Sequence, residues 1–256
     1  MDNPFSRPAA AQLYAEGRPY FHPLVIRQIT QMLPTGGARF PRALDVGCGT
    51  GLSSRALLDL ADQVVGLDES ESMLRLARYP SRIFPVCASA ERLPFCDGAF
   101  PLITVCSAFH WFARSKFLDE VARVLAPQGF LIVYWNRFRP EKLGNTTLRK
   151  FLLDHFYAHF PLTPVGHSLE PAVLAEAHPQ LCLLQVQNYA NSAEFTLTRA
   201  LSYFLSDYNV LESSQAQSPT GFDAIRRWLG EHLQKATFGC HERFDFTGKI
   251  ILWRRV

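Results

Sequence analysis

From residue 42 onward, short apolar runs rich in Val, Ile and Leu alternate with amphipathic segments. This alternation is typical of βαβ units, in which each helix crosses back over a parallel sheet. Pro127-Gln128-Gly129 predicts a turn that ends the third helix before the next strand begins. The predicted strands cover 43–46, 63–68, 83–88, 102–107 and 129–135, and the predicted helices between them cover 53–60, 70–78 and 115–125.

The alternation loosens after Trp135. Here the pattern predicts a helix over 145–160, a break over 161–166, a sixth strand over 181–189 and a seventh over 244–253. The long segment between the last two strands either roofs a binding site or fills a hydrophobic interface beneath added helices, and the pattern leaves both open. Its aromatic residues on predicted helices include Phe195, Tyr203, Phe204 and Tyr208.

Composition places the chain among ordinary globular proteins, because 48% of its 256 residues are hydrophobic and 19% are charged. These proportions exclude disordered and fibrous classes. The 26 basic and 23 acidic residues are interspersed, so the charge pattern predicts no nucleic-acid partner. No run approaches the ~20 apolar residues that a membrane span needs, so we expect no membrane partner either.

Six cysteines occur without a C-x-x-C pair. Their spacing is typical of neither a zinc site nor a disulfide framework, and we expect no bound metal. Cysteines within apolar runs behave as small hydrophobic residues, which favours a reducing, cytoplasmic setting. The polar start of the chain is followed by no continuous apolar core, so no signal peptide is predicted.

A glycine-rich turn follows the first predicted strand, in Leu44-Asp45-Val46-Gly47-Cys48-Gly49-Thr50-Gly51. Open α/β sheets bind ligands at this position, where a strand ends and a helix begins. Gly47, Gly49 and Gly51 lack side chains, so we expect a ligand to lie directly on the turn, with Cys48 within the same binding loop. A ligand carboxylate could also meet the amides that open the following helix.

Two acidic residues indicate which ligand fits the turn. Asp45 is a fixed acid beside it, which suits an ammonium or sulfonium group better than a pyrophosphate, and D-x-G-x-G-x-G differs from the G-x-G-x-x-G of dinucleotide sites. Asp68 ends the second predicted strand, where an acid can accept hydrogen bonds from ribose hydroxyls. Alternatively, Asp68 caps the helix that starts near Ser70.

Three further motifs follow in order: Gly66-Leu67-Asp68, Ala88-Ser89-Ala90-Glu91-Arg92-Leu93-Pro94-Phe95, and Ser107-Ala108-Phe109-His110-Trp111-Phe112. With the glycine-rich turn, they resemble the motifs of class I S-adenosylmethionine-dependent methyltransferases that act on small molecules, in particular the type 11 group that includes trans-aconitate methyltransferase. The resemblance extends from Leu44 to Val133. It implies that the four motifs bind, in turn, the methionine end, the ribose, the adenine and the acceptor.

The resemblance also assigns roles to single residues. Ser89, Ala90 and Glu91 would border the adenine, while Glu69 and Met73 would flank the ribose and the ring. Met73 could equally be a packing residue of its helix, and Glu91 a solvent-exposed acid at a helix end. Many relatives carry an acid at the position of Ser89 and an Asp at that of Pro101, so this chain departs from the pattern at both.

The segment after the fourth predicted strand carries the acceptor side of the proposed site. Ser107 would contact the cofactor, Trp111 would contact the acceptor, and His110 is the candidate catalytic group. An imidazole can take a proton from a hydroxyl near neutral pH or donate a hydrogen bond to a carboxylate, although His110 could also simply complete a packed loop. The segment lacks the N/D-P-P-Y/F sequence of family members that methylate amino groups of bases or amides, which favours other acceptors.

Tyr14-Ala15-Glu16-Gly17-Arg18-Pro19-Tyr20 resembles the N-terminal segment that folds over cofactor and substrate in such enzymes. Tyr14, Arg18 and Tyr20 are therefore candidate acceptor contacts, and a guanidinium can pair with a carboxylate. An ordinary surface arginine is the competing interpretation of Arg18.

Together these observations predict an α/β, Rossmann-like fold: a seven-stranded, mostly parallel sheet with helices on both faces and an added helical roof. We expect a single domain over 1–256, with N-terminal lid helices over 1–40, a cofactor-binding core over 41–137, and C-terminal strands with a helical insertion over 138–256.

The expected function is methyl transfer from S-adenosylmethionine to a small molecule, with a carboxylate or hydroxyl as possible acceptor. A protein that binds S-adenosylmethionine and regulates without catalysis would show the same cofactor residues. An NAD-dependent oxidoreductase shares the fold and the ribose acid but not the glycine spacing. The sequence indicates neither the acceptor nor the oligomeric state.

Overall fold

The structure, a computed structural model, describes residues 3–77, 79–161, 178–213, 216, 218–236 and 241–256. Most of the predicted break over 161–166 therefore lies outside the described residues. The strands are β1 (Phe40–Val46), β2 (Ala61–Asp68), β3 (Ile83–Cys87), β4 (Phe100–Cys106), β5 (Leu125–Phe138), β6 (Leu181–Phe195) and β7 (Glu242–Arg255). The helices are α1 (Pro8–Gly17), α2 (His22–Met32), α3 (Leu52–Leu57), α4 (Glu71–Leu76), α5 (Arg114–Val124), α6 (Thr146–Phe151), α7 (Tyr157–His159), α9 (Leu197–Leu205), α10 (Tyr208–Leu211) and α11 (Pro219–Lys235).

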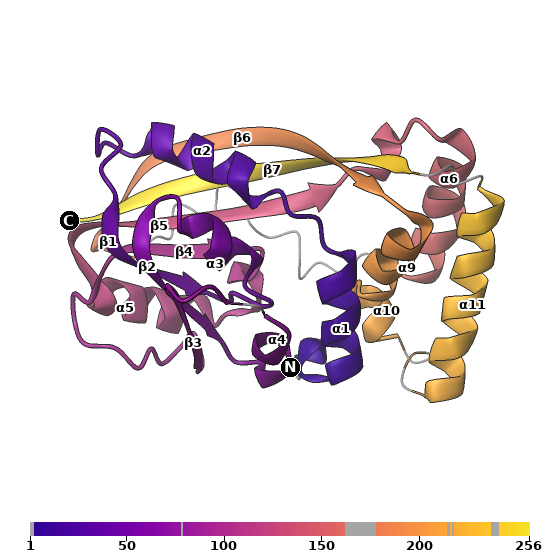
Figure 1. Cartoon of the computed structure of the whole chain (residues 1–256), viewed down its shortest axis with the longest axis horizontal. Helices are drawn as coiled ribbons and strands as arrows, with labels where there is room; N and C mark the ends of the chain where they lie inside the picture. The colour runs from indigo at the N-terminus through magenta and orange to yellow at the C-terminus, as the bar shows by residue number, and fades with distance from the viewer. Residues whose placement is uncertain (1–2, 78, 162–177, 214–215, 217, 237–240) are drawn as a thin grey trace. The chain divides into compact units, whose positions relative to one another are not determined.

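Within the described residues, the strands form one seven-stranded sheet in the order β3-β2-β1-β4-β5-β7-β6. The four pairs from β3 to β5 are parallel. Gly248 of β7 packs against the carbonyl of Trp135, whereas the Arg255 side chain, near the end of β7, donates to the carbonyl of Leu125 at the start of β5. β7 therefore runs antiparallel to β5, as the arrows in Figure 1 show. The sheet is mixed and mostly parallel, which confirms the predicted fold class.

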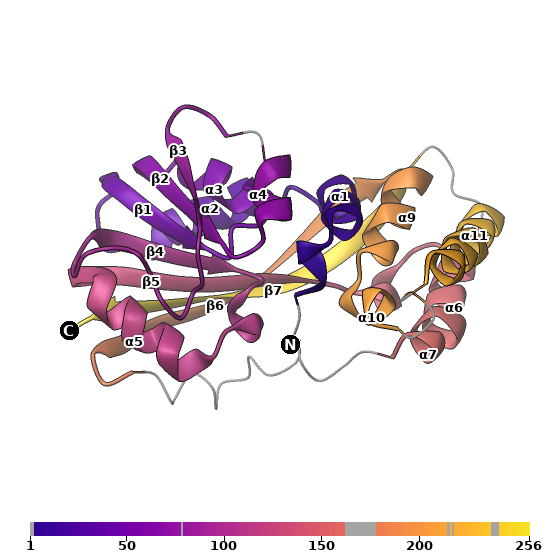
Figure 2. The same cartoon turned by 90° about the horizontal axis from the view of Figure 1, so that it is seen from below.

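Alternate residues of the central strands enter two separate hydrophobic cores. Ala43, Val64 and Leu102 pack with α2 and α3, whereas the neighbouring Leu44 and Ile103 pack with α5. Figure 2 shows α2 and α3 on one side of the strands and α5 on the other. Both faces of these strands are covered, which explains why they are nearly continuous apolar runs in the sequence.

The chain divides into two compact units. The first comprises residues 1–19, 137–163 and 190–247, and the second comprises 20–136, 164–189 and 248–256. The parallel strands and the glycine-rich turn belong to the second unit. The predicted lid segment, 1–40, contributes to both units, and the expectation of a single domain stays a prediction.

The first unit has its own aromatic core, formed by residues of α6, α9 and α11 and by the outer parts of the long strands. Phe195 is stacked on Phe244 with ring centroids 4.3 Å apart, and Tyr203 and Phe204 are buried in the same core. These three aromatic residues thus fill a hydrophobic interface, one of the two interpretations that the pattern left open. Tyr208 begins α10 and is half-buried.

The turn predicted at Pro127-Gln128-Gly129 is wrong, because these residues lie inside β5. Leu125 pairs with Phe100, but the next pair along the ladder joins Leu102 to Phe130, so β5 carries extra residues between the two pairs. Gln128 takes a positive φ of 63° within this irregularity. Pro and Gly therefore mark a bulge in the strand, a second role that both residue types have in sheets.

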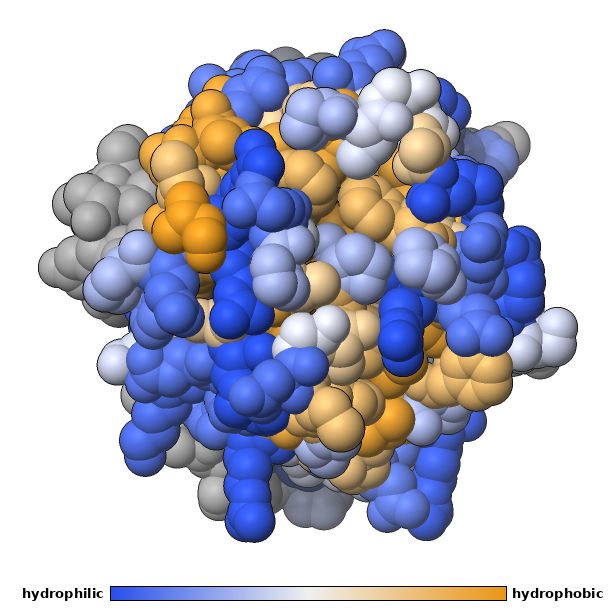
Figure 3. Space-filling view, turned by 90° about the vertical axis from the view of Figure 1, so that its left-hand side faces the viewer, coloured by the Kyte–Doolittle hydropathy of each residue, from blue (hydrophilic) through white to orange (hydrophobic). Residues whose placement is uncertain are grey.

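Both hydrophilic and hydrophobic side chains share the face drawn in Figure 3. Among the described residues, no helix combines the length and the apolar character needed to cross a membrane.

Candidate functional site

The glycine-rich turn joins β1 to α3 at the carboxyl edge of the parallel strands. Gly47, Gly49 and Gly51 have φ values of 69°, 55° and 78°, which L side chains rarely adopt. The amides of Gly47 and Cys48 both donate to the carbonyl oxygen of Leu67 in β2, at 2.8 and 3.0 Å. The turn is therefore fixed to the neighbouring strand through its backbone.

The space beside each glycine is taken by protein rather than left open. A Cβ on Gly47 would lie 2.4 Å from the Cβ of Ala108, and one on Gly51 would lie 2.7 Å from the ring of Tyr79. A Cβ on Gly49 would lie 3.2 Å from the methyl group of Met73. A Cβ at each of the three positions would therefore approach protein atoms, and the glycines allow this close packing together with the unusual backbone angles. That a ligand lies directly on the turn stays a prediction.

Asp45 lies beneath the turn and is fully buried. Its Oδ2 accepts hydrogen bonds from the hydroxyls of Ser53 and Ser54, both at 2.6 Å, and its Oδ1 accepts one from Thr104 at 3.0 Å. Burial raises the pKa of Asp45 to about 6, although the three hydroxyl donors oppose the shift. These hydroxyls belong to α3 and β4, so Asp45 joins the start of α3 to the sheet. That Asp45 favours a positively charged ligand stays a prediction.

Asp68 connects the turn to the end of β2. Its Oδ2 accepts the amide hydrogen of Gly49 at 2.8 Å, and its Oδ1 accepts that of Ser70 at 2.9 Å. Burial raises the pKa of Asp68, and these two amide bonds work against the shift. The cap of α4 is Ser70, whose hydroxyl accepts from the Met73 amide at 3.2 Å, so the alternative of Asp68 as the helix cap is wrong.

Met73, Cys48 and Glu69 complete this side of the site. Met73 is buried, and its methyl group packs against Gly49 of the turn. Gly49 is also the residue whose amide donates to the Asp68 carboxylate. The Cys48 thiol is buried 3.9 Å from the Tyr79 hydroxyl, and burial raises its pKa. Glu69 is exposed, and its carbonyl oxygen accepts from the Cys87 thiol.

The predicted adenine loop follows β3. The Ser89 hydroxyl donates to Oε2 of Glu91, whose Oε1 accepts the amide hydrogen of Ala113 at 2.8 Å. Both side chains that were expected to read the adenine are therefore engaged with protein groups. Ala90 is buried, and the Glu91 amide donates to the Ser89 hydroxyl at 3.2 Å.

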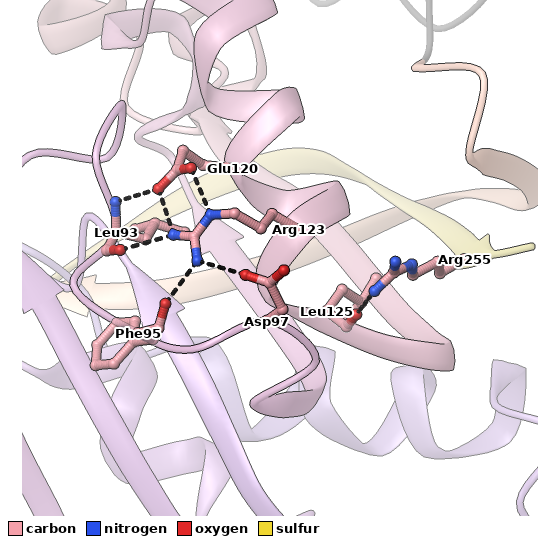
Figure 4. A network of polar contacts seen from close by, with 7 residues as sticks. All are labelled: Leu93, Phe95, Asp97, Glu120, Arg123, Leu125 and Arg255. Atoms are coloured by element: carbon pink, nitrogen blue, oxygen red, sulfur yellow. Dashed lines mark hydrogen bonds and ion pairs between the residues drawn. The ribbon is translucent and has the colours of Figure 1, made fainter.

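Arg123 of α5 fastens the far end of this loop, as Figure 4 shows. Its guanidinium donates to the carbonyl oxygens of Leu93 and Phe95, at 2.9 and 2.7 Å, and to the carboxylates of Asp97 and Glu120. Glu120 also accepts the amide hydrogen of Leu93 at 2.6 Å. The loop is thus bound to α5 at several points. Figure 4 also shows Arg255 with the carbonyl of Leu125 beside this network.

The segment after β4 begins with an unusual backbone angle. Ser107 has a φ of 52°, and its amide donates to the Tyr134 carbonyl of β5 at 2.9 Å. The short helix Phe109–Trp111 follows and carries His110. Burial, with a smaller contribution from Arg114, lowers the pKa of His110 to about 4. The imidazole is therefore neutral near pH 7, a weak base that can still donate or accept one hydrogen bond. Its ring centroid lies 5.1 Å from that of Trp111.

The sequence analysis did not identify His22 as a buried polar residue. His22, at the start of α2, lies with its Nδ1 3.0 Å from the Tyr134 hydroxyl, and the Cys106 thiol lies 3.8 Å from the same nitrogen. Burial lowers the pKa of His22 to about 3. No local signal in the sequence predicts this contact, because the partners are 112 positions apart.

The N-terminal candidates fall in different units. In the first unit, the Arg18 guanidinium lies between the rings of Tyr14 and Tyr203, 4.6 and 4.9 Å from their centroids. Its Nε is buried without a hydrogen-bond partner among the described residues. In the second unit, Tyr20 is exposed and lies under the Arg55 guanidinium at 5.1 Å.

The structure thus brings together Asp68, Gly49 and Met73, and it brings Gly47 against Ala108 at the start of the His110 segment. It does not bring Tyr14 and Arg18 together with Tyr20 in one unit. The contacts that sequence reasoning missed are those of Ser53, Ser54 and Thr104 with Asp45, and that of Tyr79 with Gly51.

Comparisons with known proteins agree with this arrangement. A family described as a methyltransferase domain matches residues 44–133. An uncharacterized methyltransferase of Mycobacterium tuberculosis is 34% identical over 138 residues, which are 53% of this chain and 54% of the relative. The malonyl-[acyl-carrier protein] O-methyltransferase of Buchnera aphidicola is 35% identical over 91 residues, 35% of this chain and 37% of the relative.

The chain therefore spans about half the length of the first of these relatives. A solved structure assigned as a type II methyltransferase from Anaeromyxobacter dehalogenans superposes with a TM-score of 0.66 at 20% identity, covering 93% of this chain and 97% of that chain. At this identity the likeness concerns the fold.

Proposed function

Through residues 44–133 the chain belongs to the class I S-adenosylmethionine-dependent methyltransferases, and on that premise we propose that it transfers a methyl group from S-adenosylmethionine to a small-molecule acceptor. When bound, S-adenosylmethionine supplies a sulfonium methyl that is already electrophilic. The chain therefore needs mainly to place an acceptor in line with the methyl and to exclude water.

The observation that carries the proposal is the position of Asp68. Its carboxylate is held at the carboxyl end of β2 by the amide of Gly49 in the turn and that of Ser70, the N-cap of α4, with one hydrogen bond to each oxygen. A carboxylate has about four acceptor positions, so each oxygen can still accept a ribose hydroxyl. The residues therefore fit a ribose beside the glycine-rich turn, which is what S-adenosylmethionine would present.

The other residues have supporting roles in this proposal. The backbone of 47–51 would receive the methionine end, and Met73 would flank the nucleoside from the position that it holds against Gly49. The backbone of 89–91 would border the adenine, since the Ser89 and Glu91 side chains are engaged elsewhere. Asp45 would hold the start of α3, the helix that follows the turn, through its bonds to Ser53 and Ser54.

We further propose a carboxylate or hydroxyl acceptor. His110 is neutral near pH 7, which suits a group that orients an acceptor by a hydrogen bond, and a carboxylate acceptor needs no general base. Arg18 stays a predicted acceptor contact. The name of the Buchnera relative indicates methyl transfer to oxygen on an acyl carrier. Tyr14, Tyr20 and Trp111 stay proposed acceptor contacts.

The test is calorimetric titration of the chain with S-adenosylmethionine, S-adenosylhomocysteine and NAD. The proposal requires binding of both sulfur compounds, and weaker binding in Asp68→Ala. Asp62→Ala is the matched control, because Asp62 lies on the same strand but is exposed and paired with Arg39. The proposed function would be overturned if the chain bound NAD alone, or if it bound none of the three compounds.

Binding does not distinguish an enzyme from a regulator that holds the same compound. Incubation with methyl-labelled S-adenosylmethionine and panels of small acids and hydroxyl compounds does. Label transferred to one class identifies the acceptor atom. Binding with no transfer across both panels would favour a non-catalytic role.

A further inference from the structure

Glu91 joins two parts of the candidate site that are distant in the sequence. One carboxylate oxygen accepts from the Ser89 hydroxyl within the predicted adenine loop. The other accepts the amide hydrogen of Ala113 at 2.8 Å, which is 22 positions further along the chain. The side chain is therefore directed at the start of α5 and not at a ligand.

Glu91 accepts a hydrogen bond at the start of α5. Ala113 is the N-cap residue of this helix, and its amide is one of those that have no acceptor within the helix. A carboxylate at a helix N-terminus is also stabilised by the helix dipole. Burial alone would raise the pKa of Glu91, but the hydrogen bonds from Ser89 and Ala113 outweigh it and hold the pKa below its usual range. Glu91 is thus a charged acceptor supplied to α5 by the adenine loop.

The same loop is fastened to the other end of α5. Arg123 and Glu120 bind the backbone of Leu93 and Phe95, as Figure 4 shows. The loop is therefore attached to α5 through Leu93 and Phe95, and to the residue that precedes α5 through Glu91.

The segment just before Ala113 is the one that carries His110. Phe112 follows the short helix Phe109–Trp111, and its ring would meet a Cβ on Gly47 at 3.3 Å. The His110 segment therefore packs on the glycine-rich turn through Ala108 and Phe112, and the Glu91 contact follows directly at Ala113.

We propose that Glu91 is a positioning residue that transmits occupancy of the adenine loop to the His110 segment through the amide of Ala113. This inference rests on the proposed function, since it requires a nucleoside at 89–91. Glu91 then has a role other than contact with the adenine. It links binding of the cofactor to the position of the His110 segment.

Hydrogen exchange measured by mass spectrometry, with and without S-adenosylhomocysteine, tests the link. In the unmodified chain, the ligand should slow exchange in peptides covering 88–92 and in those covering 108–117. In Glu91→Ala, the ligand should slow exchange at 88–92 only, and its dissociation constant should change by less than about fivefold. Loss of a merely structural contact would speed exchange at Ala113 equally with and without ligand, so the ligand-dependent difference is the informative quantity.

Glu71→Ala is the control, because Glu71 is an acid at the start of a helix, α4, but is exposed and paired with Arg75. It should leave both ligand-dependent differences unchanged. If Glu91→Ala does not fold, Glu91→Gln is measured instead. Because glutamine keeps only one of the two acceptor oxygens, at least half of the ligand-dependent protection at 108–117 should be lost. Full ligand-dependent protection at 108–117 in the Glu91 variants would overturn the inference. Failure of the ligand to bind the unmodified chain, seen separately by calorimetry, would overturn the proposed function.

Discussion

The carboxylate of Asp68 and the amide of Gly49 are joined by a hydrogen bond of 2.8 Å between Oδ2 and the backbone nitrogen. This bond connects the end of β2 to the middle of the glycine-rich turn. The acid proposed to bind the ribose is thus hydrogen-bonded to the turn proposed to bind the methionine end, and a change at Asp68 should affect both.

Replacing Asp68 by asparagine should separate charge from geometry. Asparagine keeps one oxygen that can accept from Gly49, but it loses the charge and one acceptor. We expect S-adenosylhomocysteine to bind roughly tenfold more weakly to Asp68→Asn and roughly a hundredfold more weakly to Asp68→Ala, as hydrogen bonds to a charged group contribute about 1.5–3 kcal/mol. Calorimetry measures both values. Equal affinity in the unmodified chain and both variants would exclude Asp68 from the cofactor site.

Gly47→Ala should destabilise the fold strongly. The new methyl group would lie 2.4 Å from the Cβ of Ala108, at a φ of 69° that disfavours alanine. Together, the backbone strain and the overlap should lower the free energy of unfolding by at least about 2 kcal/mol.

Urea denaturation checks the effect of Gly47→Ala. Gly144→Ala is the control, because nothing lies within 4 Å of its Cβ position, and it should change stability by less than about 0.5 kcal/mol. Adding Ala108→Gly to Gly47→Ala should recover the part due to overlap. No recovery would show that the backbone angle alone causes the loss.

His22 should make the chain less stable in acid. Its pKa is lowered from 6.5 to about 3, so between these values the unfolded chain binds a proton that the folded chain does not. The free energy of unfolding therefore falls as pH falls through this window, by roughly 2 kcal/mol between pH 7 and 5 for this group. Denaturation at both pH values should show a smaller loss in His22→Gln. An identical loss in both proteins would contradict a buried, neutral His22.

Asp45 should have the opposite effect. Its pKa is raised from 3.8 to about 6, so in this window the folded chain holds a proton that the unfolded chain has released. The free energy of unfolding therefore falls as pH rises, and the cost of the buried charge is complete above about pH 6. Relative to Asp45→Asn, the unmodified chain should lose roughly 1–2 kcal/mol between pH 5 and 7.5. A constant difference between the two proteins would mean that the hydroxyls compensate the charge in full.

The sheet could be predicted from the sequence because each central strand is an apolar run covered on both faces. β1, predicted at 43–46, occupies Phe40–Val46, and β4, predicted at 102–107, occupies Phe100–Cys106. The start of β5 could not be predicted, since Pro127 and Gly129 are as typical of a turn as of the bulge that they form.

Only those parts of the site that lie within single short motifs could be predicted from the sequence. The turn, Asp68 and the His110 segment follow from the order of residues along single stretches of chain. The contacts of His22 with Tyr134, of Glu91 with Ala113 and of Tyr79 with Gly51 join separate stretches, and no spacing rule connects them. The contact with Ala113 also engages Glu91, a side chain that was expected to border the adenine.

The three long strands have a consequence for genetic dissection of the molecule. Three of the positions at which the chain passes between its two compact units, after residues 136, 189 and 247, lie within β5, β6 and β7. Neither unit is a contiguous stretch, and a cut at any of these positions would sever a hydrogen-bonded strand. Truncation therefore offers no independently folding fragment along these boundaries, and the contributions of the two units have to be separated by point substitutions in the whole chain.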